Sequence, residues 1–482
     1  MTIDRFEVPG LAQYSYIVSS EGRSVVIDPS RDTDRYVHFL EQRGLALSYI
    51  LETHIHADFA AGSKALAEAT GAELALSAYD AGEHYQYGMA HRSLRNGDSV
   101  QLGSIRLEAL HTPGHTPEHL SFVLYDTKRS ETEPLALFSG DFLFVGSVGR
   151  PDLLGEEAKL GLAHELFHSL HRRLDALPDS VQVYPGHGAG SLCGAGMSER
   201  AESTLGYERR TNAFFGFAEE EFVREILSSV PPMPTYYPRM KELNARGAET
   251  VDPLPGAIDL SPADVHSLAK ECGVVVLDLR RPEAFGGAHI GGAINIGAGQ
   301  NLPLWAGWLL DASSRIVLVD DKGDDEESRR ALVRVGLDNL AGFLKGGMPA
   351  WIDAGLEFER TTQLSTEEVR QGQKDKLVLD VRSDAEWKAG HIEGAMHIML
   401  GDLPSAIASL PKNRSIISVC GSGYRSSIAS SLLARNGLHD VESMDGGMSA
   451  WNRRKCANRN VRLGEKRLFG LNSGEAFMGV VE

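Results

Sequence analysis

The chain has 482 residues, of which 42% are hydrophobic, so it can hold about three domains with cores of their own. Its 48 Lys and Arg residues against 66 Asp and Glu give a formal charge of −18, which argues against nucleic acid as a partner because phosphate binding depends on basic side chains. Four cysteines are too few for a disulfide framework and indicate a reducing compartment. The N-terminus lacks a signal-peptide pattern and no apolar run approaches about 18 residues, so we expect a cytoplasmic protein without a membrane segment.

Short strands alternate with polar turns through about the first 190 residues, and two helical patterns lie near 59–70 and 156–175. Most of the strands run into sequence that contains Gly or His. Loops of this kind, held by a rigid sheet, commonly carry binding and catalytic groups. The expected strands are Ser24–Asp28, Ser48–Leu51, Ile105–Leu110, Leu120–Tyr125, Leu135–Phe138 and Val181–Tyr184.

The composition changes between about 193 and 255, where helical and polar sequence is followed by prolines at 231, 232, 234, 253 and 255. Proline disfavours regular structure and is common in linkers. We therefore expect an N-terminal domain at 1–250 whose last part is a helical and Pro-rich linker.

An internal repeat with an offset of about 100 residues occupies the rest of the chain. In each copy apolar strands alternate with helical segments, which predicts a mainly parallel sheet covered by helices. We expect two α/β domains, at 256–360 and 363–482. The repeated segments are Val274–Arg280 and Leu377–Arg382, Ala288–Ala293 and Gly390–Ala395, and Gly346–Trp351 and Gly446–Trp451.

Four strand-end loops of the N-terminal domain carry histidine and aspartate. Imidazole and carboxylate are ligands of borderline metal ions, and we expect the four loops to converge on one sheet edge. The sequence therefore predicts a metal site there. The loops are Thr53–Phe59, which contains HxHxD, His111–Thr116, Ser139–Asp141 and Tyr184–Gly188.

In this order and spacing the four loops resemble those of the metallo-β-lactamase fold, an αββα sandwich with metal at the sheet edge, over about residues 1–230. Dinuclear zinc hydrolases of that superfamily, such as glyoxalase II, carry HxHxDH, and the last histidine binds the second metal. Phe59 stands at that position here and has no lone pair to donate. This departure favours a single-metal centre.

Phe59 together with Gly149–Leu153 resembles the persulfide dioxygenase branch, also called sulfur dioxygenases. The resemblance implies one Fe(II) per chain, bound by His54, His115 and Asp141, with open positions for substrate and O₂. Zinc found after purification would be redox-inactive. The residues implied to orient these ligands, or to serve as alternative ligands, are His56, Asp58 and His187.

Arg150 and Cys193 are the predicted substrate contacts of this domain. By its place in the family motif, Arg150 is implied to contact the anionic thiol carrier. Cys193 follows the last histidine loop, in a stretch that resembles the bacterial fused dioxygenases. It is either a thiol that meets the persulfide or a buried structural cysteine.

A strand in the second repeat runs into Cys420 and a glycine-rich loop that a helix follows. The loop amides, the helix N-terminus and Arg425 favour a thiolate at Cys420. With the repeated segments around it, the region at about 363–455 resembles a rhodanese domain, which implies that Cys420 carries sulfane sulfur. The residues implied to cradle the persulfide are Gly421, Ser422, Gly423 and Tyr424.

The first repeat differs at the same point. The aligned position, near Asp320, lies among carboxylates, and no cysteine occurs between 273 and 419. We therefore expect an inactive rhodanese-like domain that spaces or docks the other two, with Cys272 as a structural residue. The C-terminal tail is basic, which indicates a solvated face or docking onto an acidic surface. Its basic residues are Arg453, Arg454, Lys455, Arg459, Arg462, Lys466 and Arg467.

Together these resemblances imply a fused enzyme of sulfide detoxification, in a family where homodimers and homotetramers are common. It would oxidise a low-molecular-weight thiol persulfide with O₂ to sulfite at a mononuclear non-haem iron. Sulfur transfer through Cys420 would form or consume thiosulfate. Two alternatives stay open: a glyoxalase II-like metal-dependent thioester hydrolase fused to a sulfurtransferase, and a sulfur-relay protein with a vestigial metal site.

Overall fold

The computed structural model describes residues 1–372 and 375–453, and the chain divides into two compact units. The first unit consists of Met1–Asp259 with Ala298–Ile316 and Asp324–Phe343. The second consists of 260–297, 317–323 and the described residues from 344 onward. Because this division runs through the first repeat, the domain limits expected from the sequence stay a prediction. Cys456 and the predicted basic tail, apart from Arg453, lie outside the described residues.

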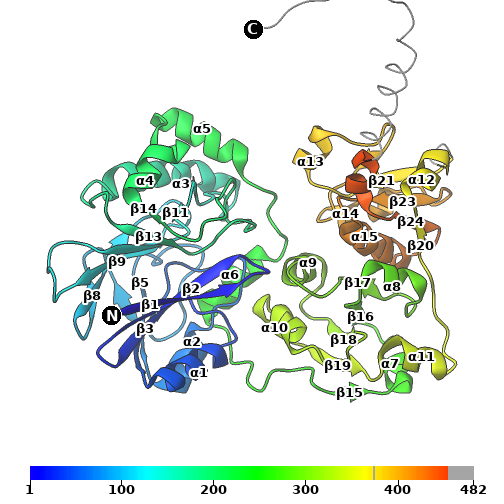
Figure 1. Ribbon diagram of the computed structural model, residues 1–482, viewed down its shortest axis with the longest axis horizontal. Helices are drawn as coiled ribbons and strands as arrows, with labels where there is room; N and C mark the ends of the chain where they lie inside the picture. Colours follow the sequence, from blue (N-terminus) through cyan, green and yellow to red (C-terminus); the bar gives the residue numbers. More distant parts are fainter. Residues whose placement is uncertain (373–374, 454–482) are drawn as a thin grey trace, which may run out of the picture. The chain divides into compact units, whose positions relative to one another are not determined.

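The N-terminal part of the first unit contains two six-stranded sheets (Figure 1). In the first sheet, with the order β1-β2-β3-β4-β5-β6, β1 to β3 are antiparallel and β3 to β6 are parallel. In the second, with the order β14-β13-β10-β9-β8-β7, β10 and β13 are parallel and the other pairs antiparallel. The strands are β1 (Thr2–Val8), β2 (Gln13–Ser20), β3 (Arg23–Ile27), β4 (Ala46–Leu51), β5 (Glu73–Ser77), β6 (Arg92–Leu94), β7 (Ser99–Leu102), β8 (Ile105–His111), β9 (Leu120–Asp126), β10 (Ala136–Gly140), β13 (Gln182–Pro185) and β14 (Ser203–Thr204), with a small hairpin of β11 (Leu143–Phe144) and β12 (Ser147–Val148).

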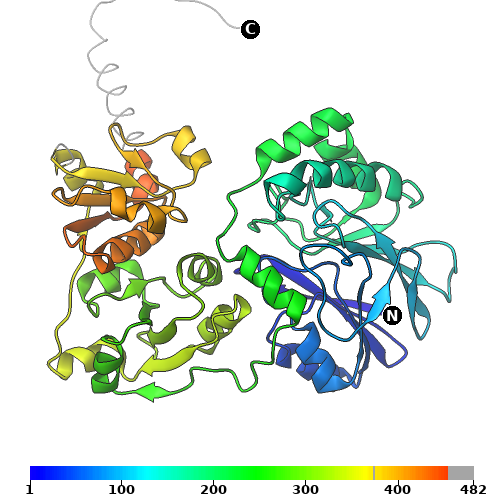
Figure 2. The same ribbon diagram turned by 180° about the vertical axis from the view of Figure 1, so that it is seen from behind.

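Apolar side chains form three layers in this domain. The inner layer lies between the two sheets and includes Val18, Leu107 and Phe138. The outer face of the first sheet packs against α1 and α2, and that of the second against α3, α4 and α5 (Figures 1 and 2). The domain is therefore the expected αββα sandwich. Its helices are α1 (Asp34–Arg43), α2 (Ser63–Thr70), α3 (Glu156–His168), η1 (Ser169–Arg173), α4 (Leu205–Thr211), η2 (Ala213–Phe215) and α5 (Glu219–Ser229).

The Pro-rich stretch after α5 is more regular than its composition indicates. It contains α6 (Tyr237–Arg246), a helix with buried Met240 and Asn244. Pro238 lies in the first turn, where its missing N–H would have no intrahelical partner in any case, so it does not interrupt the helix. Among the described residues, no helix combines the length and the apolar composition needed to cross a bilayer.

The two repeats share one topology. The first has the strand order β15-β19-β18-β16-β17, and the second has β20-β24-β23-β21-β22, so corresponding strands occupy corresponding places. The four neighbouring strand pairs of the second sheet are all parallel, as the apolar strands predicted. The elements of the first repeat are β15 (Asp259–Leu260), α7 (Pro262–Leu268), β16 (Val274–Asp278), α8 (Pro282–Gly287), β17 (Ile294–Asn295), α9 (Leu302–Leu309), β18 (Arg315–Val319), α10 (Glu326–Arg334), β19 (Leu340–Leu344) and α11 (Gly347–Asp353). Those of the second are β20 (Thr362–Leu364), α12 (Thr366–Gly372), β21 (Leu377–Asp380), α13 (Asp384–Ala389), β22 (Met396–His397), α14 (Leu403–Ala406), η3 (Ile407–Ser409), β23 (Ile416–Val419), α15 (Tyr424–Arg435) and β24 (Val441–Met444).

Replacing Asp380 with Asn is expected to destabilise the second repeat. Asp380 and Arg382 are buried, and the carboxylate accepts from Nε and Nη2 of the guanidinium at 2.9 and 2.6 Å. Loss of one partner of a buried ion pair costs about 3–5 kcal/mol. Hydrogen exchange at the amides of β21 and β23 measures the effect, with the exposed Asp384→Asn as control. Equal protection in the two variants would contradict this prediction.

Candidate metal centre and sulfur-transfer loop

Three predicted metal ligands converge at one edge of the sandwich. His54 follows β4, His115 follows β8, and Asp141 follows β10. Asp141 Oδ2 lies 3.5 Å from His115 Nε2 and 3.9 Å from His54 Nε2, and all three side chains are buried. None of these three atoms has a hydrogen-bond partner among the described residues. Unpaired buried polar atoms are rare and need a reason, and a cation bound between them supplies one. The donor set fits a divalent metal held by two imidazoles and one carboxylate.

The hydrogen bonds behind the two imidazoles fix which nitrogen is free. His115 Nδ1 lies 2.8 Å from the carbonyl oxygen of Arg150, which only accepts, so Nδ1 carries the proton and Nε2 the lone pair. His54 Nδ1 lies 2.9 Å from Thr53 Oγ1. That hydroxyl donates its own proton to Asp28 Oδ2 at 2.9 Å and therefore accepts from His54. Both Nε2 atoms are thus available as metal ligands.

Burial is the main cause that lowers the pKa values of both imidazoles well below the ordinary value, and neighbouring imidazoles lower them further. For His54 these neighbours are His56, His115 and His119. Neutral imidazole is the form that binds a metal. The two histidines are therefore ready to bind a cation near neutral pH.

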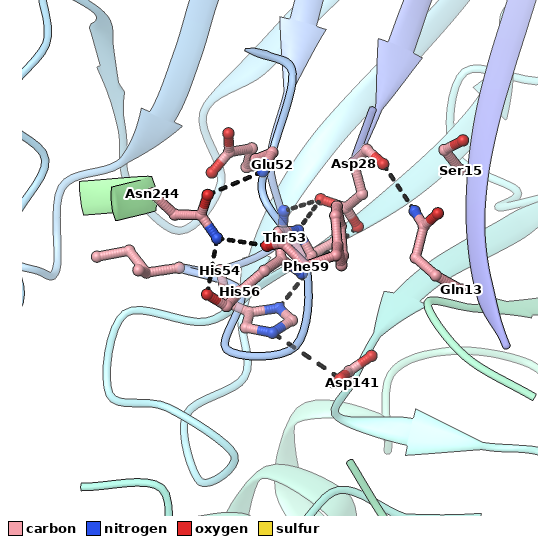
Figure 3. A network of polar contacts seen from close by, with 12 residues as sticks. Gln13, Ser15, Asp28, Glu52, Thr53, His54, His56, Phe59, Asp141 and Asn244 are labelled. Carbon is pink, nitrogen blue, oxygen red and sulfur yellow. Dashed lines mark hydrogen bonds and ion pairs between the residues drawn. The ribbon is translucent and has the colours of Figure 1, made fainter. Parts of the chain in front are cut away.

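The loop that carries His54 is held from two sides (Figure 3). On one side, the Asp28 carboxylate accepts from the Thr53 backbone N–H at 2.7 Å and from its hydroxyl, and it bonds His56 Nε2 at 3.2 Å. On the other side, Asn244 of α6 donates to the carbonyls of His56 and Phe59 at 2.8 and 2.7 Å. Asp28 thereby engages Nε2 of His56, while Nδ1 is buried without a hydrogen-bond partner in the described part of the chain, and His56 lies outside the three-ligand group.

The turn at Asp141 requires glycine before it. Gly140 has φ of +53°, and a Cβ there would lie 2.6 Å from Thr53 Oγ1 and 2.7 Å from His119 Nε2. His119 Nε2 accepts the Asp141 backbone N–H at 3.1 Å, and its Nδ1 bonds Thr112 Oγ1 at 2.9 Å. His119 is fully buried and positions Asp141, a role that sequence motifs did not reveal.

A second buried group adjoins the first. His187 Nδ1 lies 2.7 Å from Asp141 Oδ1, and its Nε2 lies 2.8 Å from Asp58 Oδ2. Because both partners are carboxylates, both ring nitrogens donate. Burial alone would lower the pKa of His187, but the Asp141 and Asp58 carboxylates raise it well above its ordinary value. Cys193 Sγ completes this group within 4.8 Å, and burial followed by the same carboxylates raises the pKa of its thiol, which stays protonated.

Arg150, predicted to contact substrate, is buried with its guanidinium engaged by protein groups. Its Nε and Nη2 donate to the Asp152 carboxylate at 2.7 and 2.8 Å, and Nη1 donates to the Leu192 carbonyl at 2.9 Å. Its backbone N–H donates to the Cys193 carbonyl at 2.9 Å. Arg150 thus ties the Cys193 loop to the loop that orients His115.

In the second repeat, Cys420 lies between β23 and α15 with its thiol buried. The Gly423 N–H donates to Sγ at 3.1 Å, and Ser426 Oγ lies 3.6 Å from it. Gly423 has φ of +110°, a conformation that favours glycine and aims this amide at the sulfur. Of the four residues predicted to cradle the persulfide, Gly423 thus makes a direct backbone N–H contact with the Cys420 sulfur.

Arg425 has a partner that the sequence did not predict. Its two terminal nitrogens each lie 2.7 Å from the carboxylate oxygens of Glu386 on α13. Burial would raise the pKa of Glu386, but Arg425 and then the Ser383 capping contacts lower it to about 2. The Ser-x-x-Glu capping box at 383–386 was the available sequence signal.

The thiol loop is also anchored to the first repeat within the second unit. Tyr424 OH donates to the Gly297 carbonyl at 2.8 Å, and Ser427 Oγ donates to Asn295 Oδ1 at 2.6 Å. The Tyr424 hydroxyl is thus engaged by the first repeat. In the first repeat itself, the acidic loop contains Asp324, which is paired with Arg329 at 2.6 and 2.9 Å.

Comparison with known proteins identifies the family. The model of the metallo-beta-lactamase superfamily matches residues 8–187, and that of the rhodanese-like domain matches 261–354 and 365–454. The mitochondrial persulfide dioxygenase ETHE1 of Bos taurus is 32% identical over 220 residues, which cover 45% of this chain and 76% of that protein. A hydroxyacylglutathione hydrolase of Polaromonas is 27% identical over 261 residues, 48% of this chain and 93% of that protein. The crystal structure of a metallo-beta-lactamase from Staphylococcus aureus is 34% identical, with a TM-score of 0.64, and covers 71% of this chain and 98% of that one.

The chain therefore belongs to the metallo-β-lactamase superfamily and carries rhodanese-like domains in its C-terminal part. Within that superfamily it belongs to the family of the ETHE1 persulfide dioxygenases. The resemblance inferred from the four histidine and aspartate loops and from the Cys420 region is confirmed at the level of family and architecture.

Replacing His119 with Leu is expected to weaken metal binding by about 10- to 100-fold, because the Asp141 backbone N–H loses its acceptor and the turn that carries the carboxylate is held less firmly. Competition with a chelator measures the affinity. His38→Leu, at an exposed histidine of α1, is the control and should bind as the unchanged protein does. Equal affinities for the two variants would show that His119 does not position Asp141.

Proposed function

We propose that this chain is a fused persulfide dioxygenase and sulfurtransferase of sulfide detoxification. The observation that carries the proposal is the buried group of two neutral imidazoles and one carboxylate whose three unpaired atoms converge, in a relative of persulfide dioxygenases. The substrate is a low-molecular-weight thiol persulfide. With O₂ and water it yields sulfite, the free thiol and a proton, and the electrons lost by the terminal sulfur reduce O₂.

His54, His115 and Asp141 would hold one Fe(II). Bound iron would supply the redox chemistry that the reaction of the persulfide with O₂ requires, whereas zinc is redox-inactive. The chain's own residues supply orientation. Asp28 acts through Thr53 to fix the His54 ring, and the His187 imidazolium holds one oxygen of Asp141 so that the other faces the two imidazoles.

The predicted substrate contacts of Arg150 and Cys193 stay predictions. The contacts of Arg150 support a different task, which is to hold the Cys193 loop beside the metal ligands. Cys193 is buried next to Asp58 and His187, which is compatible both with a thiol that meets the persulfide and with a structural cysteine. A protonated thiol at this place would not repel an incoming anion.

Cys420 performs the second reaction in this proposal. Its sulfur attacks the outer sulfur of a persulfide, the sulfur–sulfur bond breaks, and the small thiol leaves while Cys420 becomes a persulfide. Sulfite then takes that outer sulfur, which gives thiosulfate and restores Cys420. The same steps in reverse would consume thiosulfate. The Gly423 amide supports the anionic forms of the sulfur, and one chain carrying both sites raises the effective concentration of sulfite.

Two features weigh against the alternatives. A glyoxalase II-like thioester hydrolase uses a second metal, but Phe59 replaces one of its ligands and His187 is bonded at both nitrogens by carboxylates. A sulfur-relay protein with a vestigial metal site would not need three unpaired ligand atoms kept together. Turnover of S-lactoylglutathione without O₂ would favour the hydrolase.

Iron-loaded protein is expected to consume O₂ with glutathione persulfide and to release sulfite. His115→Ala should lose most of its iron and, with it, O₂ uptake, since one of three ligands is removed. Metal analysis and an oxygen electrode provide the two measurements. Metal-replete protein that holds zinc alone and consumes no O₂ would overturn the dioxygenase proposal.

Cys420→Ser is expected to abolish sulfur transfer from thiosulfate to cyanide while O₂ uptake continues, because the nucleophilic sulfur is lost and the metal ligands are untouched. Cys272→Ser is the matched control at an exposed cysteine and should retain both activities. Loss of O₂ uptake in Cys420→Ser would mean that the two reactions are not separable.

A further inference from the structure

The thiol-less first repeat has a helix in the place where the second repeat carries its active-site helix. In the second repeat, α15 follows β23 and the Cys420 loop, and in the first, α10 follows β18 and the acidic loop. α10 belongs to the same compact unit as the N-terminal sandwich. Several of its contacts within that unit are with the loops next to the candidate metal ligands.

The side chains of α10 form a buried ion pair with the sandwich. Arg334 donates to the Asp32 carboxylate at 2.5 and 3.1 Å, and the two side chains are 7% and 2% exposed. Next to this pair, Arg31 donates at 2.6 Å to Asp338, which follows α10. Truncating one member of such a pair leaves the other charge buried and unpaired, so the contact is strongly coupled to the geometry of the loop that carries Asp32.

The end of α10 also contacts the metal loop directly. The Arg334 carbonyl accepts the Ala60 backbone N–H at 2.7 Å, two residues beyond Asp58. Tyr236, which directly precedes α6, donates its hydroxyl to the Asp58 carbonyl at 3.0 Å, and Arg239 of α6 donates to the carbonyls of Val335 and Gly336 at 3.0 and 3.2 Å. The segment after His56 is therefore held between α6 and the end of α10.

The loop at 28–32 joins these contacts to the ligands. At its first residue, the Asp28 carboxylate fixes Thr53 and thereby His54. In its middle, the Pro29 carbonyl accepts the Gly62 N–H at 2.8 Å, and residues 30 and 61 form an antiparallel bridge. At its last residue, Asp32 binds Arg334 of α10. The 28–32 loop is thus bound by the Arg334 side chain, and the segment that follows Asp58 is bound by the Arg334 main-chain carbonyl.

We propose that the first repeat is the positioning element of the metal centre, with Arg334 as its positioning residue. The Arg334 side chain acts through Asp32 on the loop whose Asp28 sets His54. The Arg334 main-chain carbonyl holds Ala60, two residues beyond Asp58, and Asp58 acts through His187 on Asp141. The inference rests on the proposed metal site and goes beyond it, because it gives the repeat without a thiol a task in the first reaction. Within its own acidic loop, Asp324 is paired with Arg329.

The test uses the full chain with Arg334→Met, Arg334→Lys and the matched control Arg329→Met. Arg329 is a buried arginine on the same helix, but its partners are Asp324 and the carbonyls of Leu254 and Pro255, not the metal loops. Cobalt(II) is the probe, because its absorption spectrum reports ligand geometry whatever reaction the site performs. Chelator competition and the kcat and KM of O₂ uptake are measured on the iron form.

Arg334→Met should shift the cobalt spectrum and lower metal affinity and kcat by roughly tenfold with little change in KM. Arg334→Lys should restore part of each loss, and Arg329→Met should retain the unchanged spectrum, affinity and kcat. Sulfur transfer by Cys420 should persist in all three, which verifies that the second unit is folded. Equal spectra and affinities for the two methionine variants would overturn the proposal.

Asp32→Asn provides a second route if Arg334→Met does not fold, because Arg334 keeps its contact with Glu327 at 2.6 Å. It should shift the cobalt spectrum in the same direction, and an unshifted spectrum would count against the proposal. Failure of the proposed function is distinguishable. In that case the unchanged chain consumes no O₂, while the cobalt spectra of the variants still decide whether Arg334 positions the ligands.

Discussion

The metal centre depends on one fully buried carboxylate. An ionised carboxylate in such a place requires a partner for each oxygen. Oδ1 of Asp141 has its partner in the His187 imidazolium, which Asp58 holds from the other side. Oδ2 faces His54 and His115, and neither can donate to it, because their protons lie on Nδ1. Three lone-pair atoms, Asp141 Oδ2 and the Nε2 atoms of His54 and His115, therefore lie close together without a hydrogen-bond donor from the described residues, and a bound cation would interact favourably with all three.

The three candidate ligands could be selected from the sequence because each follows a strand, and a strand end is a local feature. The residues that hold them could not. Asn244 contacts atoms of residues 183 to 188 positions earlier, and no short motif links such distant segments. His119 and Glu386 were missed because each looked like an ordinary polar residue until the fold brought its partner close. Composition alone also could not show that Pro238 lies in the first turn of α6, where a proline does not interrupt a helix.

The repeat and the absence of a thiol from its first copy could be predicted from the sequence, but the contacts that α10 makes with the sandwich could not. In the fold, Arg329 and Arg334 are buried and paired, whereas the corresponding helix of the second copy has buried serines, among them Ser427. The same topology therefore carries two different helix surfaces: α10 contacts the sandwich, and α15 contacts the first repeat. The copies differ in the buried polar residues of this helix, which include arginines in α10 and are serines in α15, and in the segments that these residues contact.

The two imidazole ligands differ in what keeps their rings in place. The ring of His54 relies on the hydroxyl of Thr53, a side chain that a single codon change can remove. The ring of His115 relies on the carbonyl of Arg150, which belongs to the main chain and is present whatever residue occupies that position. Natural variation should therefore reach the two ligands unequally. A substitution at Thr53 can remove the hydrogen bond that orients His54, whereas a substitution at Arg150 leaves the carbonyl that orients His115 in place.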